Sequence, residues 1–385
     1  MAPPGRGRSH DGHTCRSQGR RVLHRVRTAG VTAAMTAATS CGALAILAMA
    51  GCGGSTGAPQ AGPAGAATTA DGAPPAATAA RSSLAGRGLA GPGSASGGYG
   101  PAAWSAGPRL PVAVSEVGVC LLGHAVHVLG GYVAGSAHST THLIFDTVTR
   151  RWETAAPLPE RLDHVAAVAL GGKVYAVGGY DRTGRPSPRV WLFNPVRGTW
   201  SAGVPLPTPR AAAVGVVLGG RIHLLGGIAP DGDTSEHDVF DPAAGRWIPA
   251  APIPGARDHA AAAVVDGLLH VAGGRPGGRT THLVYDPVTD RWQTLPPLPT
   301  GRSSMAGAAL PGRFVVIGGE DAAETTVTAR VDVYDVATAR WARLPDLPTA
   351  LQGIGAVTVG GVVVVPGGAP SAGGGQQSDR LLTLP

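Results

Sequence analysis

The feature that most constrains this chain is a repeat of 45 to 49 residues that begins at Trp104. Pairs of glycines and single tryptophans recur with the same spacings, and 26 residues separate each tryptophan from the next glycine pair in all six copies. The repeat is marked by Gly130, Gly178, Gly226, Gly273, Gly318 and Gly367 and by Trp104, Trp152, Trp200, Trp247, Trp292 and Trp341. This period, with several short strands in each copy, predicts the blades of a β-propeller.

Each copy divides into four predicted strands. In the third copy these are residues 213–218, 221–225, 237–240 and a strand that begins at Arg246, with glycine or proline turns between them. No window has a sustained helical period. Only the interval between the glycine pair and the aromatic residue of the third strand varies, from 12 to 16 residues. One loop per blade is therefore expected to carry the variation in length.

These glycine pairs, strand-three aromatics and strand-four tryptophans resemble kelch repeats over residues 104–385. The resemblance implies an all-β, six-bladed propeller with four antiparallel strands per blade. The chain stops where the third strand of the sixth copy should end, at Leu381–Leu384, while the stretch from Trp104 supplies a spare fourth strand. We therefore expect the N-terminal strand to close the last blade, which removes an exposed sheet edge.

The first 103 residues are predicted to be an export signal followed by a flexible linker. Residues 1–28 hold seven arginines and one acid, and a weakly apolar run leads to Met49-Ala50-Gly51-Cys52. The run resembles the lipobox of bacterial lipoproteins, so residues 1–52 are predicted to be a signal peptide with lipid attachment at Cys52. An uncleaved signal anchor and plain secretion are the alternatives, and Arg20-Arg21 leaves Sec and twin-arginine export both open. Residues 53–103 are predicted to be a disordered Ala/Gly/Pro/Ser linker.

These assignments place the body outside the cytoplasm, either anchored to the bacterial cell membrane as a lipoprotein or secreted. The net charge of +7 falls to +1 once the +6 leader is set aside, so no nucleic-acid partner is expected. The expected partners are a protein, peptide or glycan at the cell surface and the membrane itself, through the lipid anchor. The chain is expected to be a monomer, and Cys120 is expected to be a small core residue.

The candidate binding residues lie in the links between blades. In a propeller these links open on the same face as the variable loops, and kelch proteins commonly bind partners there. The candidates are Arg161, Asp163, His164, Arg210, Arg257, Asp258, His259, Arg302 and Ser303. The arginines resemble those of kelch adaptors that bind acidic peptides, and such a ring could hold a carboxylate. The alternative is that each arginine pairs with a neighbouring carboxylate and is structural.

The leading hypothesis is a non-catalytic protein- or glycan-binding module. The alternative is a carbohydrate-active enzyme of the sialic acid mutarotase type, in which Glu116, His164 and His259 would serve as acid and base near the pore. No catalytic residue, cofactor or metal is assigned. His138 and His142 lack a third metal ligand. The copper site of a galactose oxidase would need a reactive cysteine, and Cys120 is expected to be buried.

Overall fold

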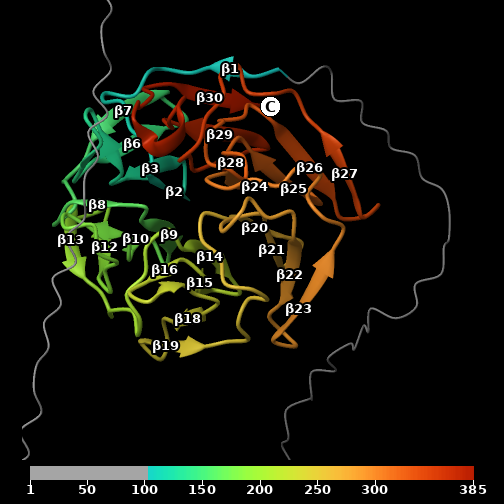
Figure 1. Ribbon diagram of the computed structural model, residues 1–385. Coiled ribbons are helices and arrows are strands. Elements are labelled where there is room, and N and C mark those ends of the chain that lie inside the picture. The colour runs from blue at the N-terminus through green and yellow to red at the C-terminus, as the bar shows by residue number, and fades with distance from the viewer. Residues whose placement is uncertain (1–102) are drawn as a thin grey trace, which may run out of the picture. The chain divides into compact units, whose positions relative to one another are not determined.

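The computed structural model describes residues 103–385, which form six four-stranded antiparallel sheets arranged around a central axis (Figure 1). The first three blades consist of β2 (Gly118–Leu122), β3 (Ala125–Leu129), β6 (His142–Asp146) and β7 (Arg151–Thr154); β9 (Ala166–Leu170), β10 (Lys173–Val177), β12 (Val190–Asn194) and β13 (Thr199–Ala202); and β14 (Val214–Leu218), β15 (Arg221–Leu225), β18 (His237–Asp241) and β19 (Arg246–Pro249).

The next two blades follow the same order, and the sixth takes its outer strand from the N-terminal end. They consist of β20 (Ala261–Val265), β21 (Leu268–Ala272), β22 (His282–Asp286) and β23 (Arg291–Leu295); β24 (Ala306–Leu310), β25 (Arg313–Ile317), β26 (Val331–Asp335) and β27 (Arg340–Arg343); and β28 (Val357–Val359), β29 (Val362–Pro366), β30 (Leu381–Leu384) and β1 (Ser105–Ala106). The prediction of six blades with four antiparallel strands each is confirmed.

The ring closes through β1, as the sequence predicts. Ser105 lies opposite Thr383 in the register of β1 and β30, and the two strands run side by side in Figure 1. Beyond β1, the Gly107 amide donates to the carbonyl of Leu381 at 2.8 Å, and the Leu110 amide donates to that of Asp379 at 2.8 Å. The two ends of the propeller thus share one sheet, and β1 covers the edge of β30 that would otherwise be unpaired.

Each of the six repeat tryptophans connects its blade to the preceding one. Its indole nitrogen donates to a backbone carbonyl in the link before that blade, as Trp200 does to Ala156 at 2.9 Å. The bond recurs in all six blades at 2.8 to 3.0 Å, and at the closure Trp104 donates to Pro345. The indole ring can therefore fill the apolar space between two neighbouring sheets while its single N–H donor is hydrogen-bonded.

The glycine pairs are required by close backbone approach. Gly178 has φ +64°, and a Cβ there would lie 2.2 Å from the carbonyl oxygen of Arg210 in the following link. The amide of Gly179 donates to that same oxygen at 2.8 Å. A side chain at Gly178 would therefore be strained and would also separate the two segments.

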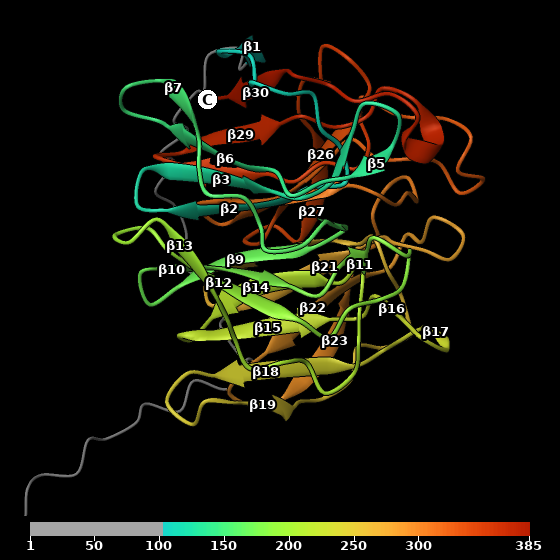
Figure 2. The same cartoon turned by 90° about the vertical axis from the view of Figure 1, so that its left-hand side faces the viewer.

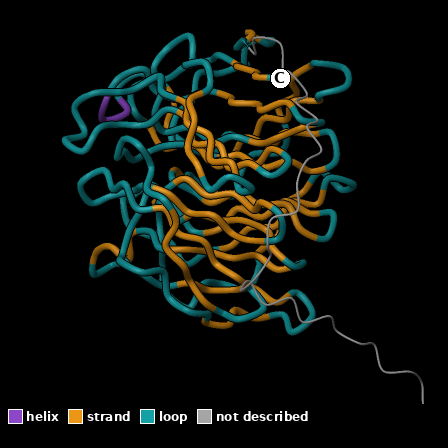
Figure 3. Tube along the Cα trace, turned by 90° about the vertical axis from the view of Figure 1, so that its right-hand side faces the viewer, coloured by secondary structure: helices purple, strands orange, loops and turns teal. Residues whose placement is uncertain are grey.

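The variable loops gather on one face. They carry the short hairpins β4 (Tyr132–Val133) with β5 (Ala137–His138) and β16 (Ile228–Ala229) with β17 (Gly232–Asp233), while β11 (Tyr180–Asp181) pairs with β8 (Leu162–Asp163). Figure 2 shows β5, β11, β16 and β17 on one side of the molecule, and Figure 3 shows the single turn of 3₁₀ helix η1 (Ala372–Gly374) on that side too. We call this side the loop face.

The core lies between the sheets. Cys120 is confirmed as a core residue, packed with Leu129 and Val174, and burial raises the pKa of its thiol to about 12. Among residues 103–385 no helix is both long enough and apolar enough to cross a bilayer. The predicted signal peptide, Cys52 and the linker lie outside the described residues.

Candidate functional site

Six equivalent residues, one from each blade, surround the axis at the loop face. Each stands just before an inner strand and lines one common pocket. They are Glu116, His164, Ala212, His259, Ser304 and Gly353. We call this set the axial ring.

The backbone of the axial ring is a closed circle of hydrogen bonds. Each amide donates to the carbonyl of the preceding member at 2.8 to 3.1 Å, from His164 onto Glu116 through to Glu116 onto Gly353. All six residues have φ between +50° and +59°, including the five that are not glycine. Such a conformation is uncommon for residues with a Cβ, and the surrounding structure must enforce it. The backbone is thus the same in every blade, and only the side chains distinguish the members.

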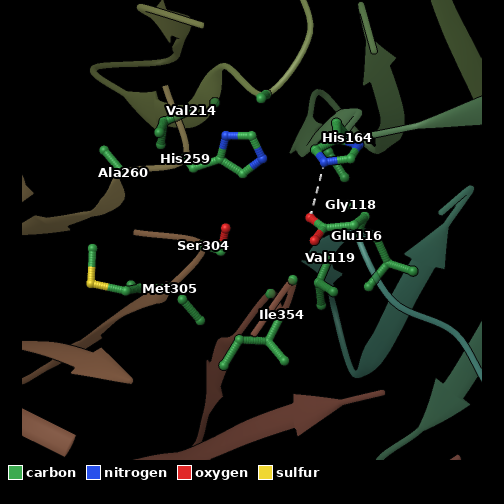
Figure 4. Close-up of a pocket in the computed structure, with 18 of the residues that line it drawn as sticks. Glu116, Gly118, Val119, His164, Val214, His259, Ala260, Ser304, Met305 and Ile354 are labelled. Atoms are coloured by element: carbon green, nitrogen blue, oxygen red, sulfur yellow. Dashed lines mark ion pairs between the residues drawn. The ribbon is translucent and has the colours of Figure 1, made fainter. Parts of the chain in front are cut away.

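Three side chains of the axial ring converge on the axis (Figure 4). Nε2 of His164 lies 3.3 Å from Oε2 of Glu116, and the His164 and His259 rings meet edge to face with centroids 5.0 Å apart. Gly353 makes room for this group, because a Cβ there would lie 2.4 Å from the Glu116 carboxylate. Ala212 is also small, so the two imidazoles can approach each other across it.

A buried carboxylate orients each imidazole. Nδ1 of His164 bonds Oδ1 of Asp163 at 2.5 Å, and Nδ1 of His259 bonds Asp258 in the same way. His138 from β5 bonds the other oxygen of Asp163. Each aspartate immediately precedes its histidine, and both are almost fully buried. These contacts fix both rings so that the Nε2 atoms face the pocket.

Two tyrosines flank His164. The Tyr132 and Tyr180 rings lie edge-on to His164, with centroids 5.7 and 5.4 Å from it. Both residues directly follow a glycine pair, and their backbones pair with Ser115 and Asp163. Burial and the nearby carboxylates raise the pKa of the Tyr180 hydroxyl to about 12, so it is a hydrogen-bond donor at neutral pH.

On the side of the axial pocket opposite His164, the loop face carries an ion pair. Nη2 of Arg275 donates to the buried Glu320 carboxylate at 2.8 Å and to the Ser304 hydroxyl at 3.3 Å. Nε of Arg275 also pairs with Glu324 at 3.0 Å. The site therefore has an acid within hydrogen-bond reach of an arginine beside the axis.

The pKa values of the two axial histidines move in opposite directions. Burial opposes protonation of His164, but Glu116 and Asp163 outweigh it and raise the pKa of this residue. Burial, reinforced by the nearby His164, holds the pKa of His259 well below its ordinary value. The same protein thus presents two imidazoles of different basicity to one pocket.

The pocket bounded by the axial ring is small. Its cavity volume is about 170 Å³, and the inner strands that line it below the ring contribute mostly glycine, alanine and valine. Typical sites for drug-sized ligands measure about 300–1,000 Å³. The pocket suits a single small polar group and not an extended ligand.

Three of the four predicted site arginines do not face this pocket. Arg210, Arg257 and Arg302 are at most 2% exposed. Arg210 pairs with Asp238 and Arg302 with Asp332, while Arg257 donates to the Thr281 hydroxyl at 2.8 Å and to backbone carbonyls. Because these guanidinium groups are enclosed and already bonded, the expected ring of arginines at the channel mouth is corrected to a structural role.

Arg161 also differs from its predicted place. The position that corresponds to Arg210 is Leu162, since the carbonyl of Leu162 accepts from the amide of Gly131 and the carbonyl of Arg210 accepts from the amide of Gly179. Arg161 is exposed and donates only to the carbonyl of His138, at 3.3 Å. Of the remaining predicted residues, only His164 and His259 line the pocket. Asp163 and Asp258 bond these histidines from behind, and Ser303 is buried.

Sequence reasoning missed the residues that follow the glycine pairs. Tyr132, Tyr180, Arg275 and Glu320 occupy this equivalent place, and each pairs its backbone with the link residue before the axial ring. Their fixed offset from the glycines was the available signal.

Comparison with known families supports the fold. Residues 116–319 match the model of the KLHDC2/KLHL20/DRC7 kelch-repeats domain, and residues 301–348 match the kelch motif. The first match spans 204 of the 385 residues, which is more than half of the chain. The chain therefore belongs to the family of KLHDC2/KLHL20/DRC7 kelch-repeat domains.

A solved structure shares the architecture. The structure of YjhT has a TM-score of 0.62 and 18% sequence identity to this chain, covering 72% of this chain and 96% of its own. At this identity the similarity concerns the fold alone. No curated protein matches the sequence.

Proposed function

We propose that this protein is a binding propeller whose ligand is a small polar group, such as the terminal sugar of a glycan, held at the axial ring. The observation that carries this proposal is the concentration of oriented polar side chains around one small pocket. Glu116, His164 and His259 face inward there, with Tyr132 and Tyr180 beside them. Hydroxyl-rich ligands require this combination of donors, acceptors and aromatic edges.

The charge at the mouth favours a neutral or mixed ligand over an acidic peptide. The buried arginines are enclosed, and Arg275 is already neutralised by Glu320 and Glu324. The carboxylates of Glu116, Asp163 and Asp258 stand close to the axis. An approaching carboxylate would be repelled by these acids, whereas a sugar hydroxyl can donate to Glu116 and accept from the Tyr180 hydroxyl.

The test is a screen of the full chain against glycans and cell-wall fragments, followed by calorimetry of any ligand found. We expect Tyr180→Phe and Glu116→Gln each to weaken binding about tenfold, which corresponds to one lost hydrogen bond. Asp231→Ala is the matched control, because Asp231 is an exposed loop-face residue outside the axial ring. Equal losses in all three variants, or binding unaffected by the first two, would contradict the proposal.

A second candidate is sugar mutarotation, favoured by the geometry of the two imidazoles. Each is oriented by its own aspartate and presents Nε2 to the same pocket, which is the arrangement that paired proton transfer requires. Exchange between sugar anomers, followed by nuclear magnetic resonance with sialic acid and neutral reducing sugars, tests it. Acceleration that His259→Ala abolishes supports an enzyme, whereas binding without acceleration supports the binding module.

We also propose that the propeller is exported and tethered through Cys52. The support is the basic leader, the apolar run and the small residues before that cysteine. Mass spectrometry of the mature protein should find a lipidated Cys52 at the N-terminus. A Cys52→Ser variant should then lose membrane association. An unmodified, uncleaved leader would contradict the lipoprotein assignment.

A further inference from the structure

We propose that Glu116, His164 and His259 form a binding site for one divalent first-row transition metal ion on the propeller axis. The inference deepens the proposed function, on which it rests for the location of the ligand site, by assigning a metal ion to that site. One carboxylate oxygen and two imidazole nitrogens from these residues all lie within 4.8 Å of one another.

The hydrogen bonds behind the histidines leave the correct nitrogens available. Asp163 and Asp258 accept from Nδ1 of His164 and His259, so in the neutral rings Nδ1 carries the proton and Nε2 carries the lone pair. Histidines that ligate metals commonly donate their other nitrogen to a carboxylate, which fixes the tautomer and the ring orientation. Both halves of the proposed site have this arrangement, on two different blades.

Nε2 of His259 has no hydrogen-bond partner, although it is buried. The side chain is only 6% exposed and points into the pocket beside Glu116 and His164 (Figure 4). A buried polar nitrogen without a partner is destabilising. A bound cation at this point would satisfy that nitrogen.

The spacing suits a metal ion after a small adjustment. Two ligand atoms that each lie about 2.1 Å from a tetrahedral ion are about 3.4 Å apart. The observed separation of His164 Nε2 and Glu116 Oε2 is 3.3 Å, and the widest separation in the group is within 4.8 Å. A modest side-chain rotation of His259 would therefore bring the third ligand into range.

The ligand set indicates the class of metal. Two imidazoles and one carboxylate suit zinc, iron, cobalt, nickel, copper or manganese, whereas magnesium and calcium prefer oxygen ligands alone. Of the three remaining positions of the ring, Ala212 and Gly353 carry no ligand atom, and the hydroxyl of Ser304 accepts from Arg275. Three protein ligands with a free side are typical of sites that bind a water or a substrate at the metal.

The architecture by itself does not require these side chains. Ala212 occupies the equivalent place with φ +53°, close to the +51° of His259, and Gly353 completes the same hydrogen-bonded circle. The propeller thus tolerates a small residue in this position. The converging histidines and glutamate are therefore best explained by what they bind.

The test is a Co²⁺ titration of the tag-free full chain after treatment with a chelator, followed by absorbance and by calorimetry. We expect one ion per chain with a dissociation constant below about 10 μM. His259→Ala should weaken binding at least 100-fold, and Glu116→Gln at least tenfold. His259→Ala should remain folded, because Ala212 has the same backbone conformation. His124→Ala is the matched control, since His124 is an exposed histidine on the turn after β2.

Absence of saturable binding, or equal binding by the wild type and His259→Ala, would overturn the proposal. The glycan measurements are repeated with and without the chelator, which separates the two hypotheses. A glycan that binds equally well in both conditions supports the binding propeller and overturns a metal-dependent site. Specific Co²⁺ binding without any glycan ligand supports the metal site and overturns the proposed ligand.

Discussion

The arginines before the inner strands illustrate how the partner of a residue decides its role. The six equivalent positions are occupied by Val114, Leu162, Leu351 and the three buried arginines. Arg210 and Arg302 face an aspartate on the third strand of the same blade, whereas Leu351 faces Leu382. An ion pair and an apolar pair thus fill the same space in different blades. These residues are enclosed within the blade and do not line the axial pocket.

Loss of one partner from the Arg210–Asp238 pair should be strongly destabilising. Asp238→Leu removes the close carboxylate from the guanidinium of Arg210, which is 0% exposed, and leaves it only Glu236 at 3.8 Å. We expect the free energy of unfolding to fall by about 3–5 kcal/mol. Chemical denaturation measures the change.

The double variant Arg210→Leu with Asp238→Leu provides the control, because it copies Leu351 and Leu382. It should recover most of the lost stability, since replacing a buried ion pair by apolar residues is often neutral. Arg343→Ala, which breaks an exposed pair with Asp346, should change stability by less than about 1 kcal/mol. A double variant as unstable as Asp238→Leu would contradict the structural role.

At the scale of the strands, three blades contain a buried pair of histidines. In the first blade, Nδ1 of His127 on β3 lies 3.0 Å from Nε2 of His142 on β6, and His142 bonds the Ala156 carbonyl through Nδ1. The third and fourth blades repeat this arrangement with His223 and His237 and with His270 and His282. In the neutral ring of His142, Nδ1 donates to the Ala156 carbonyl, so Nε2 accepts from Nδ1 of His127.

These pairs should make the propeller sensitive to acid. Burial lowers the pKa of His127 and His142 from 6.5 to about 4. The unfolded chain therefore binds more protons than the folded chain between about pH 6.5 and 4, so stability is full above pH 6.5 and falls as the pH decreases. We expect each of these histidines to remove about 3 kcal/mol of stability by pH 4. Thermal unfolding between pH 8 and 4 measures it.

The fifth blade supplies the control for this prediction. Val315 and Val331 occupy the places of His127 and His142 there and are fully buried. The double variant His127→Val with His142→Val should therefore fold and should lose about a third of the acid sensitivity. An unchanged pH profile in this variant would show that other groups cause the acid sensitivity.

The strands were predictable because each blade repeats the same pattern of glycine, aromatic residue and tryptophan. The axial positions of His164 and His259 were predictable too, since they lie at a fixed distance from the glycine pairs. The environment of each side chain was not predictable. Whether Arg302 meets solvent or Asp332 depends on a strand 30 residues away, and the repeat does not encode that contact. The predicted place of Arg161 was wrong by one residue. In an extended segment, a shift of one residue moves a side chain from the buried face to the exposed face.

At the scale of the whole molecule, closure of the ring is what assembles the site. The circle of hydrogen bonds through the axial ring is complete only if Glu116 of the first blade meets Gly353 of the last, at 2.8 Å. That contact requires the first and sixth blades to be neighbours, and β1 secures them by joining the sheet of β30. The pocket, the metal ligands and the loop face all depend on this junction.

The most direct test of this closure is an engineered disulfide between Ser105→Cys and Thr383→Cys, in a chain whose Cys15, Cys41 and Cys52 are replaced by serine. These two residues are register partners in β1 and β30, a separation compatible with disulfide geometry. The shifted pair Ala106→Cys with Thr383→Cys is the control, because its side chains point to opposite faces of the sheet. Mass spectrometry should find the first pair fully oxidised, with a raised unfolding temperature, and the shifted pair largely reduced. Free thiols in the first pair, or equal crosslinking of both, would contradict the closure and the axial site built on it.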